Sequence, residues 1–143
     1  LNDTSVSRSR HVLIVGGGLL GLELAAALRE VDVRITIVQR SNRLMERQLD
    51  ATASLLLAKE VQARGIQIYF RNEVETVFST GDLGSLRITF KSGKELDCSA
   101  VVYAIGTRPN LEIGREAGLD CGRGIAVNDR LCTSAPARIF CCP

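Results

Sequence analysis

The sequence predicts an α/β protein in three layers, with a central parallel sheet and an antiparallel β-meander. Two observations carry this prediction. In the first half of the chain, short apolar runs alternate with helical patterns, which favours a parallel sheet with right-handed crossovers. After residue 73 the pattern changes to alternating apolar and polar residues between turn signals, which is typical of antiparallel strands with one wet face.

The first strand, the first helix and the second strand are predicted over residues 11–15, 19–30 and 33–38. The first run is apolar after its histidine and β-branched at three positions, as expected of a parallel strand buried on both faces. In the helix a leucine recurs at every fourth position, so one helical face can pack on the sheet. These elements therefore form a β-α-β unit.

A second helix and a third strand extend this unit. Asp50 is a favourable N-cap, and Gly65 supplies a C-terminal stop. Between them the apolar residues follow at helical spacing, namely Ala53, Leu56, Leu57 and Val61. Ile66, Ile68 and Phe70 then alternate as a strand. The resulting β-α-β-α-β succession is Rossmann-like.

The rest of the chain is predicted as a meander, one further buried strand, a short helix and a last strand. The strands of the meander cover residues 74–78, 86–90 and 95–97. Residues 100–105 are again almost all apolar and should return to the parallel sheet. The short helix and the last strand are predicted over residues 111–117 and 124–127.

Length and composition indicate one soluble globular domain. The chain has 143 residues, the size of a single domain, and 45% hydrophobic residues exclude a disordered chain. No apolar stretch approaches the roughly 18 residues of a membrane-spanning helix. The polar first ten residues do not resemble a secretory signal. We therefore expect a cytoplasmic protein with no membrane partner.

The charged and metal-ligating residues indicate neither nucleic acid nor a metal as a partner. The 18 Lys and Arg and the 16 Asp and Glu give a net charge of +2, and they are scattered rather than gathered in a basic stripe. The five cysteines form no Cys-x-x-Cys pair, and the one histidine lies far from them in sequence. We expect reduced thiols, with Cys98 at a strand edge as a small apolar residue.

Residues 16–21 match the pattern G-x-G-x-x-G between a predicted strand and a predicted helix. Gly16 permits the tight turn, Gly18 lets the backbone approach a pyrophosphate, and Gly21 allows close helix–strand packing. The helix N-terminus then offers N–H donors and about half a positive charge to a phosphate. The alternative is a glycine-rich turn that only joins the two elements. The context favours a bound dinucleotide.

Three stretches of the chain together resemble the pyridine nucleotide-disulfide oxidoreductase superfamily. They are residues 15–25 around the glycines, residues 102–110 and residues 133–140. The resemblance implies an NAD(P)H-binding domain over residues 11–140, inserted in an FAD-binding domain of the same parent chain. It therefore implies a dinucleotide as ligand here and FAD bound outside this chain.

Two further stretches, residues 44–50 and 123–130, are similar to the large subunit of NAD(P)H nitrite reductases. This resemblance implies that the parent protein is an FAD-dependent NAD(P)H oxidoreductase. Rubredoxin reductases, ferredoxin reductases and NADH oxidases have similar stretches and remain alternatives. A stand-alone nucleotide-sensing module is an alternative of a different class.

The chain departs from the family pattern at its end. Family members pass into an Ala-x-Gly-Asp or Ala-x-Gly-Glu turn that holds the flavin, whereas residues 141–143 read Cys-Cys-Pro. We interpret residues 141–143 as a truncated tail at the return to a missing FAD domain, and residues 1–10 as a linker or an artificial boundary. The fragment alone is predicted to be inactive, with no catalytic residue of its own.

The resemblance also implies which residues contact the nucleotide. They are Gly16, Gly18 and Gly21 at the pyrophosphate, Leu19 and Leu20 as N–H donors, Glu23 near the nicotinamide, and Ile105 and Gly106 beside the cofactor. For Glu23 the alternative is an ordinary glutamate at a helix start. For Gly106 the alternative is a plain turn glycine.

The end of the second strand bears on the choice between NADH and NADPH. An acidic residue there would bind the ribose 2′-hydroxyl of NADH, but the chain has Gln39 followed by Arg40. Gln39 can bind a ribose hydroxyl without repelling a 2′-phosphate, and Arg40 or Arg43 can pair with that phosphate. NADPH is therefore favoured modestly. The alternative is that both arginines point to solvent and the site accepts either nucleotide.

Overall fold

The computed structural model describes residues 10–81, 85–135 and 140–141, which fall into two compact units. The first unit ends at Gly106 and the second begins at Thr107. Apart from Arg10, the predicted linker lies outside the described residues, as do Cys142 and Pro143 of the predicted tail. The single domain over residues 11–140 stays a prediction.

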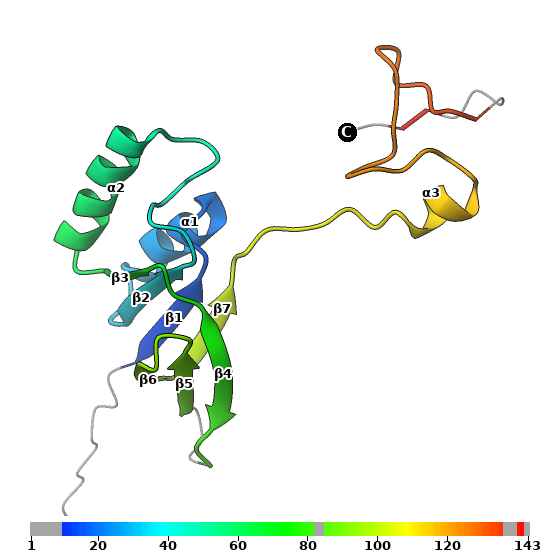
Figure 1. The fold of residues 1–143 in the computed structure, drawn as a ribbon. Helices are drawn as coiled ribbons and strands as arrows, with labels where there is room; N and C mark the ends of the chain where they lie inside the picture. The colour runs from blue at the N-terminus through cyan, green and yellow to red at the C-terminus, as the bar shows by residue number, and fades with distance from the viewer. Residues whose placement is uncertain (1–9, 82–84, 136–139, 142–143) are drawn as a thin grey trace, which may run out of the picture. The chain divides into compact units, whose positions relative to one another are not determined.

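A parallel sheet forms the middle of the first unit (Figure 1). Its strands β1, β2, β3 and β7 cover His11–Val15, Arg34–Gln39, Gln67–Phe70 and Ala100–Tyr103. They lie in the order β3-β2-β1-β7, and each neighbouring pair is parallel. Val15 at the end of β1 pairs with Val38 on one side and with Tyr103 on the other. The predicted parallel sheet is therefore confirmed.

The two predicted helices of this unit are also present, as α1 over Leu19–Leu28 and α2 over Ala51–Ala63. Asp50 caps α2, because its Oδ1 accepts a hydrogen bond of 2.8 Å from the Ala53 N–H. Gly65 follows the helix at φ +82°, a left-handed conformation that suits glycine at a helix end. Both signals that predicted this helix are therefore confirmed.

Two predicted boundaries are too long. The first helix ends at Leu28 rather than at Glu30, because the Glu30 N–H bonds back by only three residues, to the Ala27 carbonyl. The strand β7 ends at Tyr103 rather than at Ile105. Its partner β1 ends at Val15, and the chain turns away at the following glycine.

Alternate residues of the central strands enter two separate cores. Val12 and Ile14 of β1 pack on the helix side, together with buried Ala25, Ile35, Ile37, Leu44, Ala58, Val61 and Ile66. Leu13 lies on the opposite side, with buried Val38, Ile88, Phe90 and Cys98. Burial of a Leu or Ile side chain contributes about 1.5–3 kcal/mol. The sheet is thus covered on both faces, and the predicted three layers are confirmed.

The third layer is the antiparallel meander of β4, β5 and β6, over Val74–Ser79, Leu86–Phe90 and Glu95–Cys98. The Tyr69 ring of β3 meets the Phe90 ring edge-on, with centroids 5.6 Å apart, which joins this layer to the parallel sheet. On the solvent-exposed face of the meander, Arg87 Nε donates a hydrogen bond to Asp97 Oδ1 over 2.9 Å. Cys98 is buried at the end of β6, as predicted.

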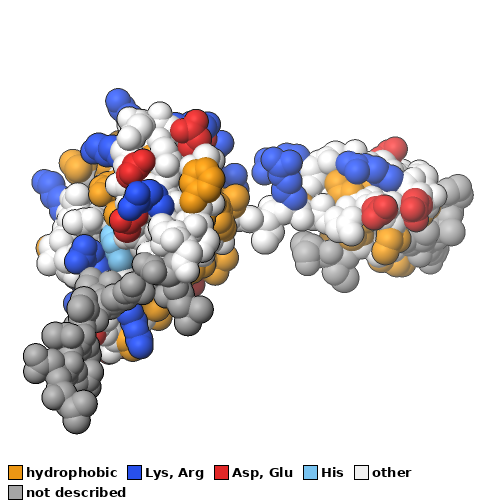
Figure 2. Space-filling model, turned by 90° about the horizontal axis from the view of Figure 1, so that it is seen from below, with side chains coloured by type: hydrophobic (Ala, Val, Ile, Leu, Met, Phe, Trp, Pro, Cys, Tyr) orange, Lys and Arg blue, Asp and Glu red, His pale blue; other side chains and the backbone are white. Residues whose placement is uncertain are grey.

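Cations and anions are intermixed on the visible face of the first unit (Figure 2). One ion pair, between Arg87 and Asp97, joins β5 to β6, and another, between Lys91 and Glu73, joins the residues next to the ends of β5 and β4. Exposed ion pairs of this kind contribute about 0–1 kcal/mol each. The meander therefore carries both cations and anions at its surface.

The second unit contains the short helix α3 over Glu112–Glu116, close to the predicted 111–117. The predicted strand over residues 124–127 is wrong. Of these residues Ile125 makes one isolated bridge, to Cys121, and the next N–H, that of Ala126, donates to the Asp120 carbonyl in a loop. No helix among the residues that the structure describes is both long and apolar enough to cross a membrane.

Candidate functional site

The glycine loop, residues 16–21, leads from the end of β1 into α1. The Gly16 N–H donates to the carbonyl oxygen of Val38 over 2.9 Å, which ties the loop to β2. Gly16 has φ +117°, a conformation that L-residues rarely adopt. A Cβ there would also overlap the Ala104 carbonyl oxygen. The close approach of the two backbones therefore requires glycine.

Gly21 is required for a different contact inside the chain. It lies in the first turn of α1 and is buried. A Cβ on Gly21 would overlap the carbonyl oxygen of Gly16 and would lie 3.4 Å from Ile14 Cγ2. Glycine at this position therefore lets α1 pack directly on the loop and on β1, as the sequence pattern predicts.

Gly18 differs from both, because nothing in the chain requires its lack of a side chain. Its backbone has φ −85° and ψ −173°, which any residue adopts. A Cβ on Gly18 would meet nothing within 4 Å. The space over Gly18 is thus open at the mouth of the loop.

The N-terminus of α1 faces this open space through its backbone. The first helical hydrogen bond runs from the Leu22 N–H to the Gly18 carbonyl over 3.0 Å. The N–H groups of Leu19 and Leu20 precede it and have no partner within the helix. Gly18 is the N-cap and has no side chain that could occupy them. Leu19 and Leu20 are 52% and 63% exposed, so these donors lie at the surface.

The segment after β7 lies beside the loop. The Ala104 N–H donates to the Val15 carbonyl over 2.8 Å, and Ile105 N would be 3.4 Å from a Cβ on Gly16. Ile105 is 72% exposed, and Gly106 follows at φ +90°. The crossovers run in opposite directions from β1, toward β2 and toward β7, and such a switch point is where open α/β sheets bind ligands.

Gln39 at the end of β2 contacts the loop from the other side. Its Oε1 accepts a hydrogen bond of 2.7 Å from the Gly17 N–H, and its Nε2 donates to Ser41 Oγ over 2.8 Å. An amide side chain has two N–H groups and two lone pairs, so these contacts use half of its capacity. The structure therefore shows Gln39 as a link between two loops. Its contact with a ribose stays a prediction.

The two arginines of the predicted site follow Gln39. Arg40 is exposed, and Arg43 is half-buried, with its carbonyl oxygen accepting a hydrogen bond of 2.9 Å from Ser41 Oγ. The hydrogen bond from Lys91 lowers the pKa of the Glu73 carboxyl, and the charge of Arg40 adds to this effect. Arg40 therefore lies within electrostatic reach of the turn after β3.

Glu23 is exposed on α1, one turn beyond Leu19. The structure thus brings together the backbone of the glycine loop, Gln39 and Ile105.

The sequence pattern did not single out Gly17, which the structure shows to be a central residue of the loop. Gly17 is buried, and its carbonyl oxygen accepts a hydrogen bond of 2.9 Å from the Met45 N–H. A Cβ on Gly17 would overlap the side chain of Leu44, which is fully buried. The signal in the sequence is the middle glycine of three consecutive ones, at a position where the motif accepts any residue.

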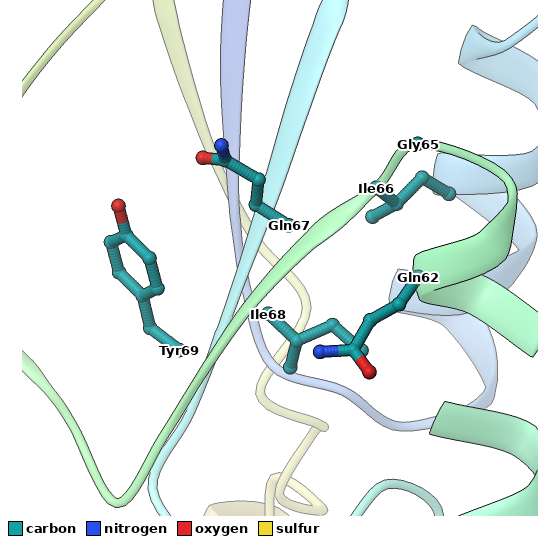
Figure 3. A pocket seen from close by; sticks show the side chains of 6 residues that line it. All are labelled: Gln62, Gly65, Ile66, Gln67, Ile68 and Tyr69. Atoms are coloured by element: carbon teal, nitrogen blue, oxygen red, sulfur yellow. The ribbon is translucent and has the colours of Figure 1, made fainter. Parts of the chain in front are cut away.

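One shallow hollow, about 440 Å³ in volume, lies elsewhere in the first unit. It runs along β3 and the end of α2 and is lined by Gln62, Gly65, Ile66, Gln67, Ile68 and Tyr69. Figure 3 shows Ile68 and Tyr69 on opposite sides of the strand. None of the residues of the predicted site lines this hollow. Among the described residues no three His, Cys, Asp or Glu side chains are placed to hold a metal ion.

Known proteins are similar to this chain over most of its length. The family model described as pyridine nucleotide-disulphide oxidoreductase matches residues 1–142. Nitrite reductase (NAD(P)H) of Bacillus subtilis is 37% identical over 137 residues, which cover 94% of this chain and 17% of that protein. Nitric oxide reductase FlRd-NAD(+) reductase of Vibrio vulnificus is 37% identical over 131 residues, which cover 92% of this chain and 34% of that protein.

A solved structure of a related protein shares this fold. A ferredoxin reductase from Rhodopseudomonas palustris superposes with a TM-score of 0.82 and 30% identity, over 87% of this chain and 31% of that one. The chain thus spans about a third or less of these relatives. The match over residues 1–142 confirms the prediction from the three sequence stretches: the chain belongs to the pyridine nucleotide-disulphide oxidoreductase family.

Proposed function

We propose that this domain binds NAD(P)H with the pyrophosphate on the glycine loop. The observation that carries the proposal is the difference between the three motif glycines. Gly16 and Gly21 are required by contacts within the chain, whereas a Cβ on Gly18 would meet nothing. Glycine at position 18 therefore serves a group that comes from outside the chain.

The residues around Gly18 fit a diphosphate. The N–H groups of Leu19 and Leu20 point out of the exposed N-terminus of α1, where the helix dipole favours negative charge. On the other side of the loop, exposed Ile105 offers an apolar surface to the nucleoside part of the ligand. Glu23 is proposed to lie near the nicotinamide. Bound NAD(P)H would supply a hydride, while these residues hold and orient the nucleotide.

We propose a modest preference for NADPH over NADH. The end of β2 carries an amide and then Arg40, with Arg43 three residues further on, and no carboxylate that would repel a 2′-phosphate. A guanidinium group binds phosphate through charge-assisted hydrogen bonds. Arg40 is exposed and therefore accessible to such a ligand.

We further propose that the parent protein is a cytoplasmic oxidoreductase in which this domain presents the nicotinamide to FAD bound by another domain. The length of the relatives supports this proposal, because they extend far beyond the matched residues. Hydride transfer needs the reacting atoms held about 3–3.5 Å apart, so two binding surfaces must cooperate. We expect the 143-residue chain to purify colourless and without NADH-dependent reductase activity. Stoichiometric flavin retained through gel filtration would contradict this expectation.

The nitrite reductase type is proposed for the parent protein because residues 44–50 and 123–130 resemble those enzymes, and a Bacillus nitrite reductase matches 94% of the chain. The coding sequence on either side of this segment tests the assignment. Siroheme-binding and iron–sulfur cysteine motifs are expected there. A rubredoxin-like module in their place would assign the protein to the rubredoxin reductases.

Calorimetric titration of NADH and NADPH into the wild type and into Gly18→Val tests the binding site. The branched side chain would fill the open space over the loop, so affinity should fall about 100-fold or more, equivalent to about 2.7 kcal/mol. Thermal stability should fall only modestly, because the added atoms meet nothing in the chain and valine is a poorer N-cap than glycine.

Gly124→Val is the matched control for this titration. Gly124 also has open space around its Cβ position and no left-handed φ, but it belongs to the second unit and is not one of the proposed site residues. This variant should bind both nucleotides like the wild type. Unchanged affinity in a folded Gly18→Val protein would mean that the pyrophosphate is not bound on this loop.

A further inference from the structure

We propose that Gln39 and Ser41 are positioning residues that set the preference between NADPH and NADH. They form a hydrogen-bond relay, defined here as Gly17, Gln39, Ser41 and Arg43, between the glycine loop and the loop after β2. The inference rests on the proposed function and deepens it. It assigns to Gln39 a role through its neighbours, beyond direct contact with a ribose.

The relay has one consistent direction. The Gly17 N–H donates to Gln39 Oε1 over 2.7 Å, and Gln39 Nε2 donates to Ser41 Oγ over 2.8 Å. The Ser41 hydroxyl then donates to the Arg43 carbonyl over 2.9 Å. Each group in the middle accepts at one end and donates at the other, which strengthens hydrogen bonds arranged in series. The relay thus joins the glycine loop to the backbone of Arg43.

A second set of contacts holds the same loop from behind. The Met45 N–H donates to the Gly17 carbonyl over 2.9 Å, so both polar groups of Gly17 bind residues at or beyond the end of β2. Leu44 is fully buried, and its carbonyl accepts a hydrogen bond of 2.7 Å from Ser54 Oγ. Residues 44 and 45 are therefore anchored independently of Ser41. The Arg71 N–H donates to the Ser41 carbonyl over 3.1 Å, so the backbone up to Ser41 is also held by the turn after β3. Loss of the Ser41 hydroxyl should therefore free residues 42 and 43 and leave the rest of the loop in place.

Residues 42 and 43 include Arg43, one of the two arginines that are proposed to pair with a 2′-phosphate. An arginine side chain loses rotamer entropy when it binds a ligand, and a fixed backbone reduces what must be ordered on binding. NADH has no 2′-phosphate and therefore does not need Arg40 or Arg43 for binding. A looser segment should therefore weaken NADPH binding and leave NADH binding nearly unchanged.

The relay also gives a reason for an amide at position 39. A carboxylate could accept from the Gly17 N–H, but it has no hydrogen to donate to Ser41. The Ser41 hydroxyl would then turn to donate to the carboxylate, and its hydrogen bond to the Arg43 carbonyl would be lost. Gln39→Glu therefore breaks the relay at its second step while it preserves the first.

Titration of NADH and NADPH into Ser41→Ala, Ser41→Thr and Gln39→Met variants of the 143-residue chain tests the relay. For Ser41→Ala we expect NADPH affinity to fall about 3- to 10-fold and NADH affinity to stay within about twofold, the size of effect of one hydrogen bond. Ser41→Thr retains the hydroxyl and should restore the wild-type ratio. Gln39→Met also releases the Gly17 N–H and should weaken both nucleotides.

Ser99→Ala is the matched control. Ser99 is half-buried like Ser41, and its hydroxyl also donates to a backbone carbonyl, that of His11, over 2.9 Å. It should lower thermal stability without changing the ratio of the two affinities. If Ser41→Ala keeps the wild-type ratio, or if it changes the ratio no more than Ser99→Ala does, the relay is wrong. A wild type that binds neither nucleotide would instead contradict the proposed function.

Discussion

Polar groups are arranged differently at the two ends of the parallel sheet. Near the amino ends of the strands, polar side chains bind one another. His11 Nε2 lies 2.9 Å from Thr36 Oγ1, and the Thr36 hydroxyl donates to Gln67 Oε1 over 3.3 Å. His11 and Thr36 are both buried. This amino edge, defined by His11, Thr36 and Gln67, is therefore closed by contacts within the chain.

The carboxyl edge, defined by the glycine loop, Gln39 and Ile105, is arranged in the opposite way. The N-terminus of α1 leaves backbone donors at the surface, and the space over Gly18 is open. Leu20 and Ile105 are 63% and 72% exposed. The same strands thus support stability at one edge and offer a binding surface at the other. Substitutions at the two edges should separate these two properties.

The largest effect on stability is expected at Gly16, where contacts within the chain also close the carboxyl edge. Gly16→Ala would force a Cβ onto the Ala104 carbonyl at φ +117°. Strain of this backbone and overpacking each contribute about 1–3 kcal/mol, so the free energy of unfolding should fall by more than about 2 kcal/mol. Urea denaturation measures the change.

Gly18→Ala serves as the control for Gly16→Ala, because it adds the same methyl group two residues away in open space. Its free energy of unfolding should fall by about 1 kcal/mol or less, because the methyl group meets nothing in the chain and alanine is only a poorer N-cap than glycine. Equal losses in the two variants would show that the loop does not divide into closed and open positions.

The next effect concerns binding at the carboxyl edge. Arg40→Ala or Arg43→Ala should weaken NADPH about tenfold to a hundredfold and leave NADH nearly unchanged, because a hydrogen bond to a charged group contributes about 1.5–3 kcal/mol. Titrations at low and high salt measure this effect, and screening by salt should reduce it. Equal losses for both nucleotides, or a wild-type preference for NADH, would contradict the pairing of an arginine with the 2′-phosphate and would favour NADH as the ligand.

Thr36→Val probes the amino edge with a substitution of almost the same shape. The valine would leave His11 Nε2 and Gln67 Oε1 without the hydroxyl that they contact. A buried polar group without its partner costs about 1–3 kcal/mol, so stability should fall by that amount. Affinity for both nucleotides should not change. A loss of affinity in a variant of unchanged stability would mean that the two edges are coupled.

The fold could be predicted where burial leaves a clear pattern. Residues 11–15 are apolar almost throughout because β1 is covered on both faces, and this pattern identifies a central parallel strand. The predicted strand at residues 124–127 failed for the converse reason. Ile125 and Val127 alternate with other residues, but alternation does not say whether a partner strand is near. In the structure Ile125 is the one residue of this segment that forms a bridge, and its partner is Cys121.

The candidate site could be predicted only in part. The roles of Gly16 and Gly21 follow from local backbone geometry, and the structure gives each a contact that excludes a side chain. The contact of Gln39 with Gly17 joins residues 22 positions apart and depends on how β1 packs beside β2. An amide side chain carries both donors and acceptors. Its identity alone does not reveal whether it serves a ligand or a neighbouring loop.

The smallest effect is the pH dependence of the amino edge. Burial, helped by the charge of Arg34, lowers the pKa of the His11 imidazole below its ordinary value of 6.5, against an opposing hydrogen bond with the Asp97 backbone. The unfolded chain therefore takes up the His11 proton at higher pH than the folded protein does. Where the unfolded state binds more protons, stability rises with pH. The contribution of neutral His11 is complete above about pH 6.5 and is lost as the pH falls through the range below it.

His11→Gln isolates this contribution, because glutamine stays neutral throughout the range and its amide can still donate to Thr36. Urea denaturation of both proteins at about pH 7.5 and about pH 5.5 brackets the ordinary pKa of histidine. The wild type should lose more stability between the two pH values than the variant, since all other groups titrate alike in both. An equal loss would show that His11 accepts its proton as readily in the folded protein as in the unfolded chain. The amino edge would then be open to water, and the contrast with the carboxyl edge would rest on the glycine loop alone.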